Sequence, residues 1–132
     1  MVSLEQVLDC ISPKDALIIF RTIAAENGNS EELKMKTKLT RKQYYSRMSK
    51  LVEADLVNKV NGRYSLTALG EVVYNSLSLI ENGLNVYWKL KTIDALKADK
   101  GSSIPKAEHR NLVDTLIEDG QIKEILAKRL SL

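Results

Sequence analysis

The spacing of apolar residues predicts a short helix at the start of the chain. Leu4, Val7, Leu8 and Ile11 recur at the three- and four-residue steps that place side chains on one side of a helix. Ser3 directly precedes them, and a serine hydroxyl is a favoured acceptor for the first free backbone N–H groups of a helix. We therefore expect Ser3 to cap this helix.

A second predicted helix is apolar over most of its circumference between positions 16 and 23. Ser12, Pro13 and Asp15 open it, because proline suits the first helical position and an acid suits the first turn. Asn27-Gly28 is expected to end it with a left-handed residue. Its apolar character predicts that it is the central helix of the core.

Two further helices are predicted between positions 30 and 54. Ser30 is the expected cap of the segment EELKMK, in which Leu33 is expected to turn inward with Met35 as its candidate companion. A tight connection over 37–39 leads to Thr40, the expected cap of an amphipathic helix. The inward residues of that helix follow at i, i+4, i+7 and i+8: Tyr44, Met48, Leu51 and Val52.

A hairpin and a helical C-terminal half complete the prediction. Val57–Val60 and Arg63–Leu66 are short strand-like runs, and the Asn61-Gly62 between them suits a two-residue turn that needs positive φ. Thr67 is expected to cap a helical region that extends to position 96 as one bent helix or two abutting helices, weakened at Asn82-Gly83. A loop over 100–106 is expected to precede a helical region over 108–130 with a joint at Asp119-Gly120.

Positive charge is concentrated in one part of the chain. Residues 34–66 carry nine cations and two acids, whereas the remainder carries 11 cations and 15 acids, so the net charges are +7 and −4. Between Lys34 and Lys50 there is no acid at all. A field focused in this way is typical of a surface that meets a polyanion.

Composition narrows the possible classes. The 132 residues are 44% hydrophobic and 28% charged, which favours one folded domain with an appendage, and no run approaches the roughly 20 apolar residues of a membrane-spanning helix. The N-terminus lacks a signal-peptide layout, so a cytoplasmic protein is expected. The lone Cys10 and lone His109 give no metal site and no catalytic pair, and no enzyme motif or cofactor motif is present. Cys10 is expected to be a small buried hydrophobe rather than a redox sensor.

The stretch SEELKMKTKLTRKQYYSRMSKLVEADLVNKVNGRYSLTALG, residues 30–70, resembles the winged helix-turn-helix transcription regulators, in particular small archaeal and bacterial ones. The resemblance rests on the inward Leu33, the turn residue Leu39 before the cap Thr40, the run RMSKLVEADLV and the closing LTALG. It implies a mainly α fold with a two-stranded β-wing. Residues 1–70 would form the winged helix-turn-helix DNA-binding domain, and residues 71–132 a helical extension that forms a dimer.

A DNA-binding surface follows from the charge, the helix prediction and the resemblance together. Once Tyr44 and Met48 turn inward, the outer side chains of the basic helix suit the major groove of double-stranded DNA, and the capped helix N-terminus suits a phosphate. Tyr44 is expected in the core and Tyr45 outside it. The hairpin tip is expected to contact the DNA backbone. The candidate DNA-binding residues are Lys34, Lys36, Lys38, Thr40, Arg41, Lys42, Gln43, Tyr45, Ser46, Arg47, Lys50, Lys59, Asn61 and Arg63.

The helical region after position 69 is too apolar for an isolated solvated rod, and two interpretations stay open. It forms a homodimer, as helices outside the DNA-reading core commonly do in this class, or it folds back onto its own domain. The candidate dimerisation residues are Val73, Leu77, Ile80, Leu84, Tyr87 and Trp88.

Two functional alternatives also stay open. A winged helix can serve as a protein-interaction module that does not read DNA, in which case the basic surface meets an acidic protein. Binding to RNA or single strands would favour more exposed aromatic residues than Tyr45 alone. The sequence specifies neither an operator, nor the sign of regulation, nor an effector ligand.

Overall fold

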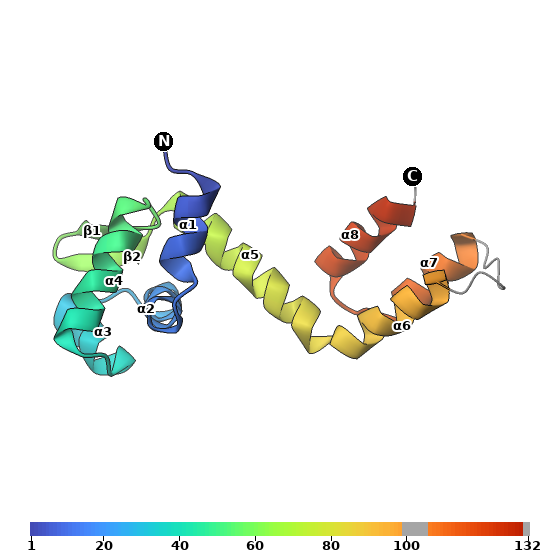
Figure 1. Ribbon diagram of the computed structural model, residues 1–132, viewed down its shortest axis with the longest axis horizontal. Helices are drawn as coiled ribbons and strands as arrows, with labels where there is room; N and C mark the ends of the chain where they lie inside the picture. The colour runs from blue at the N-terminus through green and yellow to red at the C-terminus, as the bar shows by residue number, and fades with distance from the viewer. Residues whose placement is uncertain (99–105, 131–132) are drawn as a thin grey trace. The chain divides into compact units, whose positions relative to one another are not determined.

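The computed structural model describes residues 1–98 and 106–130 and is mainly α-helical, with one two-stranded antiparallel sheet (Figure 1). The expected loop over 100–106 lies outside the described residues except for Lys106. The elements, in chain order, are α1 Leu4–Ile11, α2 Lys14–Ala25, α3 Ser30–Thr37, α4 Arg41–Glu53, β1 Val57–Val60, β2 Arg63–Leu66, α5 Ala68–Asn85, α6 Tyr87–Ala98, α7 Lys106–Leu116 and α8 Gly120–Leu130.

The chain divides into two compact units, Met1–Asn75 and Ser76–Leu132, called unit 1 and unit 2 below. The sequence-based expectation placed the division at 70/71. The observed division falls inside α5, so the first turns of this helix belong to unit 1 and its last turns to unit 2.

Helix α2 is the centre of unit 1, as its apolar sequence predicted. It contacts α1, α3, α4 and β2, and Ala16, Ile19, Phe20 and Ile23 are buried along it. Burial of these four side chains removes apolar surface from water, and this burial is the main driving force for packing the unit around α2.

The N-terminal caps were predicted in part. Ser3, Thr40 and Thr67 accept hydrogen bonds from backbone N–H groups three residues ahead, as expected. The prediction was wrong for Ser12, because α2 begins one residue later than expected and Pro13, which has no side-chain oxygen, is its N-cap. It was also wrong for Ser30, where Asn29 provides the cap through a bond from Glu32 N.

The expected left-handed end of α2 at Asn27-Gly28 was wrong. The chain leaves α2 in an extended conformation at Glu26, with φ −148° and ψ 121°, and Gly28 has no positive φ. The reason is a long-range pairing: Gly28 forms an antiparallel bridge with Tyr64, whose N–H donates to the Gly28 carbonyl at 2.8 Å. The segment therefore behaves as a one-residue third strand beside β2.

Four predicted inward residues are instead exposed. Met35 is 78% exposed on the outer side of α3, and Val52 is 40% exposed because only Tyr44, Met48 and Leu51 form the line on α4 that faces the core. On α1, Leu4 and Leu8 are both exposed, and the buried side is formed by Cys10 and Ile11. Cys10 is buried, as expected, and its burial raises the pKa of the thiol, which disfavours the reactive thiolate.

The hairpin forms as predicted. Strands β1 and β2 pair antiparallel with Val57 opposite Leu66 and Val60 opposite Arg63, and Asn61 and Gly62 occupy the turn with φ 53° and 76°. Both central residues therefore have the positive φ that a type I′ turn requires.

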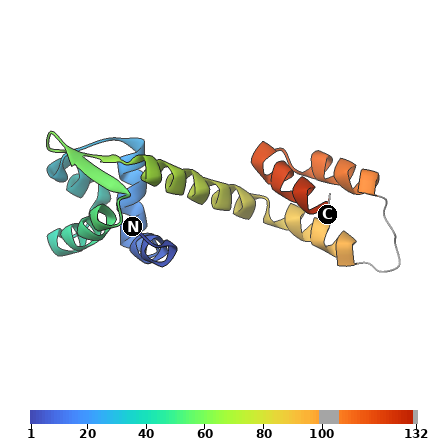
Figure 2. The same ribbon diagram turned by 90° about the horizontal axis from the view of Figure 1, so that it is seen from above.

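Unit 2 contains the end of α5 and the helices α6, α7 and α8 (Figure 2). Its core consists of Ile93, Val113, Ile117 and Ile122. The helical region after Thr67 is two abutting helices, and the break lies at Val86 rather than at Asn82-Gly83.

The joint between α7 and α8 lies at residues 117–119, in agreement with the predicted break at Asp119-Gly120. The Asp119 carboxylate accepts hydrogen bonds from Gln121 N, from Ile122 N and from the side-chain amide of Asn82. Asp119 thus caps α8 and links it to the last turns of α5.

Candidate nucleic-acid interface

A capping box fixes the first turn of α4. The Thr40 hydroxyl accepts a hydrogen bond from Gln43 N at 3.2 Å, and the Gln43 side-chain oxygen accepts one from Thr40 N at 3.1 Å. Thr40 and Gln43 were both expected to contact DNA. In this arrangement the Gln43 oxygen is used by the helix itself, so only its amide nitrogen is left for a ligand.

The outward face of α4 is the face opposite its buried residues. Tyr44, Met48 and Leu51 are buried, and the opposite face presents the exposed Lys42 and Ser46. Ser49 belongs to the same face but was not among the predicted site residues. Ser49 lies seven residues after Lys42 and three after Ser46, and this spacing places all three on one helix face. The sequence could therefore have predicted Ser49 as part of the site.

Tyr45 lies in a small aromatic and cationic cluster between α3 and α4. It is 42% exposed, and its ring meets the buried Tyr44 ring edge to face at 5.2 Å between centres. Lys34 Nζ lies 4.9 Å from the centre of the Tyr45 ring and donates to the Tyr45 hydroxyl at 3.3 Å. Arg41 lies over the same ring at 5.8 Å. These contacts hold Tyr45 in one place without burying it.

The two tyrosines are not equivalent, as expected from the sequence. Tyr44 is fully buried with its hydroxyl 3.5 Å from the Ser30 hydroxyl, and burial raises the pKa of Tyr44. The hydrogen bond to the Tyr45 hydroxyl, followed by the nearby Glu31 carboxylate, raises the pKa of Lys34, so this amine stays charged.

Four of the predicted DNA-binding cations have acid partners within unit 1. Lys34 pairs with Glu31 at 3.3 Å, and Lys36 pairs with Glu26. The sequence argument relied on the absence of acids between positions 34 and 50. These partners lie just before that segment in the chain, so the argument overestimated the free positive charge.

The pair between Arg47 and Asp15 is the most enclosed of these. The Arg47 Nε lies 2.9 Å from the Asp15 carboxylate, and the side chains of the two residues are only 30% and 19% exposed. Asp15 is on α2, so this pair joins α4 to the central helix. Arg47 therefore has a structural role in addition to any contact with a ligand.

Arg63, at the start of β2, is held against the opposite strand-like segment. Its guanidinium donates to the Asn27 carbonyl at 2.7 Å and lies 3.5 Å from the Glu32 carboxylate. Both partners face the same Nη2 atom, so the side chain is fixed beside the start of α3 rather than extended from the hairpin tip.

Five predicted cations have no acid partner within the described residues 1–98 and 106–130. Three lie together in sequence at the turn before α4 and in its first turn: Lys38, Arg41 and Lys42. Lys59 is exposed on β1 and lies 5.5 Å from the Tyr64 ring centre. Lys50 lies in a shallow groove between α1 and α4 that Glu5, Asp9 and Glu53 also line.

The uncompensated charge is therefore strongest at the N-terminal end of α4. There the cations Lys38, Arg41 and Lys42 all lie within two positions of Thr40, the N-cap of α4, where the helix dipole adds positive potential. Toward the C-terminal end of α4, the acids around Lys50 reduce the net positive charge. The exposed Asn61 at the hairpin tip adds a polar group without charge.

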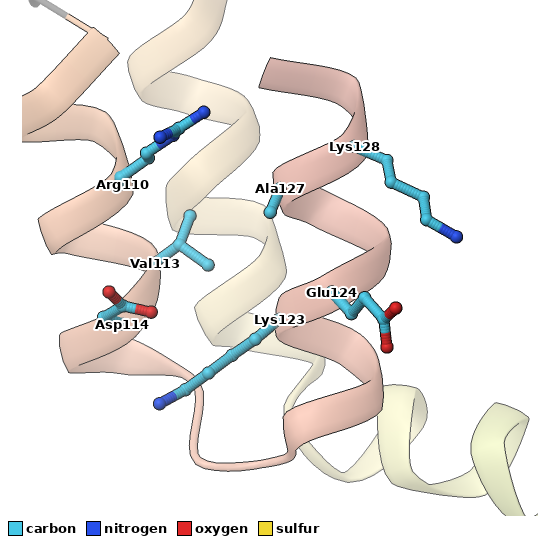
Figure 3. Close-up of a pocket in the computed structure, with 7 residues that line it drawn as sticks. All are labelled: Arg110, Val113, Asp114, Lys123, Glu124, Ala127 and Lys128. Atoms are coloured by element: carbon cyan, nitrogen blue, oxygen red, sulfur yellow. The ribbon is translucent and has the colours of Figure 1, made fainter. Parts of the chain in front are cut away.

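Unit 2 contains a cavity of about 360 Å³ between α7 and α8 (Figure 3). Val113 and Ala127 face each other across it, and Arg110 and Lys123 are accompanied by Asp114 and Glu124. The mixture of both charges specifies no ligand class. Nearby in sequence, His109 is 7% exposed, and neither ring nitrogen has a hydrogen-bond partner in the described part of the chain.

Among the described residues, no helix has the combination of length and apolar character that a bilayer crossing requires. Comparisons of the chain with protein-family models, with curated proteins and with solved structures found no match. The geometry of the site is therefore the basis for a functional proposal.

Proposed function

We propose that unit 1 is a winged helix-turn-helix domain that binds double-stranded DNA and that the chain acts as a transcription regulator. In this proposal α3 and α4 with the turn between them form the helix-turn-helix, and the hairpin β1–β2 is the wing. The observation that carries it is the group of exposed, acid-free cations Lys38, Arg41 and Lys42 at the start of α4.

The element order supports this assignment. A buried helix, an extended residue paired to the sheet, two short helices and an Asn-Gly hairpin follow one another as α2, Gly28, α3, α4 and β1–β2. An α-helix fits the major groove of B-DNA, and its N-terminal half is the part that usually reaches base edges. Helix α4 has this half capped, cationic and exposed.

Each exposed side chain has a proposed role. Lys38 and Arg41 contact phosphates at the edge of the groove, and Lys42, Ser46 and Ser49 face the base edges from the outward face of α4. The hydroxyl or ring edge of Tyr45 contacts a phosphate or a thymine methyl group.

The hairpin has a smaller role in this proposal. Its two-residue turn is short, so Lys59 contacts the DNA backbone and the hairpin does not enter the minor groove deeply. Arg63, which Asn27 and Glu32 hold beside α3, positions the hairpin instead of contacting DNA.

The test is a salt series of fluorescence anisotropy with a labelled random-sequence duplex. We compare the wild-type chain with a variant that combines Lys38→Ala, Arg41→Ala and Lys42→Ala. Each phosphate contact contributes about 0.9 to the slope of log affinity against log salt concentration. The variant is therefore expected to bind more weakly, with a slope smaller by up to about 3.

A matched control removes three cations from unit 2 through Lys89→Ala, Arg110→Ala and Lys123→Ala. The net charge changes equally, so this control is expected to keep a slope close to that of the wild type. Equal losses in both variants would mean that only overall charge matters. No duplex binding by the wild type at low salt would overturn the proposal and favour the winged helix as a protein-interaction module.

A further inference from the structure

Gln43 lies in the first turn of α4 and is exposed, but its side-chain oxygen is fully occupied. This oxygen accepts one hydrogen bond from Thr40 N at 3.1 Å and a second from the Thr40 hydroxyl at 3.1 Å. A carbonyl oxygen has two lone pairs, so the capping box leaves no acceptor on this amide for a ligand. The amide nitrogen of Gln43 remains, and it can only donate.

The occupied oxygen changes which base Gln43 can recognise. In the major groove a glutamine recognises adenine through two bonds, because its oxygen accepts from the N6 amino group while its nitrogen donates to N7. The bond from N6 requires the oxygen that Thr40 already holds. While the capping box is closed, Gln43 therefore cannot make the pair of bonds that identifies adenine.

Lys42 is the longest side chain on the outward face of α4, and it has no acid partner in the described part of the chain. Its ammonium group has three N–H donors and no acceptor. Ser46 and Ser49 share the face, but their hydroxyls both donate and accept, so they tolerate several bases. Arg47, further along the helix, is held by Asp15 on α2 at 2.9 Å.

A group that only donates favours guanine over the other bases. Guanine presents two acceptors in the major groove, O6 and N7, whereas adenine presents an acceptor beside a donor and cytosine presents a donor. We propose that Lys42 selects a guanine in the DNA site by donating to O6 and N7, while the capping box keeps Gln43 from selecting adenine. This role of Lys42 depends on the proposed binding of α4 to duplex DNA, and it specifies the base that the helix reads.

The experiment begins with selection from a random duplex library by the wild-type chain. The enriched duplexes are expected to share a guanine, and anisotropy then compares the selected duplex with two altered forms. Replacing that G·C pair with A·T is expected to weaken wild-type binding by a factor of about 5–100. Replacing the guanine with 7-deazaguanine, which lacks the N7 acceptor but still pairs with cytosine, is expected to weaken it by a factor of about 10.

Two variants assign the preference to Lys42. Lys42→Gln introduces an amide whose oxygen lies outside the capping box, so it is expected to shift the preference at this position from guanine to adenine. Lys50→Gln is the matched control, because it makes the same change in the last turn of α4, where the acids of the groove between α1 and α4 lie nearby. Both variants lose one positive charge, but Lys50→Gln is expected to keep the preference for guanine.

Three results would overturn this role of Lys42 and leave duplex binding by unit 1 intact. The first is salt-dependent duplex binding without a preference for guanine at any position. The second is a guanine preference that Lys42→Gln leaves unchanged, because another side chain would then read the base. The third is selection of adenine by the wild type, as expected if Gln43 leaves the capping box. By contrast, no duplex binding at low salt would overturn the DNA-binding proposal itself, and the role of Lys42 with it.

Discussion

Lys38 holds a backbone conformation that usually belongs to glycine. It ends α3 with φ 56° and ψ 28°, and its N–H donates to the Lys34 carbonyl. A left-handed conformation costs a residue with a β-carbon about 1 kcal/mol relative to glycine. We therefore expect Lys38→Gly to increase the free energy of unfolding by up to about 1 kcal/mol, measured by urea denaturation.

The same substitution is expected to weaken DNA binding, because it removes one of the acid-free cations beside α4. The salt slope should decrease by about 0.9. Lys36→Gly is the control for the stability measurement. Lys36 lies inside α3, so glycine there should lower the free energy of unfolding by about 1 kcal/mol. A Lys38→Gly variant that is destabilised, or that binds DNA as the wild type does, would contradict this role for Lys38.

Arg47 and Lys42 are two cations on the same helix with different surroundings. Arg47 is paired with the half-buried Asp15, so Arg47→Ala is expected to lower the free energy of unfolding by about 1 kcal/mol. Lys42 is exposed without an acid partner in the described part of the chain, so Lys42→Ala should change the free energy of unfolding by less than about 0.5 kcal/mol. In the anisotropy salt series the larger effect belongs to the other variant. Lys42→Ala is expected to reduce the slope of log affinity against log salt concentration more than Arg47→Ala does.

At the scale of elements, the start of α5 depends on one close approach. Gly70 is buried, and a β-carbon at this position would lie 2.1 Å from the Leu56 carbonyl oxygen, which also accepts the Thr67 N–H. Gly70→Ala would push α5 away from the segment between α4 and β1. We expect a loss of about 2–3 kcal/mol in the free energy of unfolding, measured by urea denaturation.

Gly83→Ala is the matched control within the same helix. A β-carbon there has nothing within 4 Å, so alanine should raise the free energy of unfolding by about 0.5–1 kcal/mol through its better helix propensity. If both variants behaved alike, the close approach at Gly70 would have no energetic importance.

Local sequence signals predicted most elements, and the exceptions have a common cause. The caps Ser3, Thr40 and Thr67 and the Asn61-Gly62 turn depend on residues within three or four positions, and the sequence was sufficient for them. The end of α2 at Glu26 depends on the pairing of Gly28 with Tyr64, which is 36 positions further along the chain. Local patterns carry no information about such a contact.

The same limit applied to the candidate site. The exposure of Lys42 and Ser46 followed from the helical period once Tyr44 and Met48 were assigned to the core. The pairs that occupy Arg47 and Arg63 join residues 32 and 31 positions apart, namely Asp15 and Glu32. The sequence therefore predicted where positive charge is concentrated but not which cations remain without a partner.

At the scale of the whole molecule, the DNA-binding proposal and the expected homodimer together predict the symmetry of the DNA site. The exposed Ile80, Leu84, Tyr87 and Trp88 are the candidate dimer surface. A two-fold dimer presents two copies of α4, so selection from a random DNA library should yield inverted repeats. When both copies of α4 can bind at once, the affinity for the full repeat is higher than that for a half-site by a factor of about 10²–10⁴. Leu84→Glu should bind a half-site as the wild type does but lose this gain on the full repeat.

The measurement is anisotropy with the selected full repeat, with a half-site duplex and with a repeat whose spacing is changed by half a helical turn. Ile125→Glu should keep the wild-type preference for the full repeat, because Ile125, which is 49% exposed on α8, lies outside the candidate dimer surface. The altered spacing should weaken the wild type but not Leu84→Glu, since a single copy has no second half-site to reach. If Leu84→Glu kept the full gain, the two copies of α4 would be coupled by a surface other than the candidate dimer surface. If selection gave asymmetric sites, the DNA proposal would stand for a single copy and the dimer would have another role.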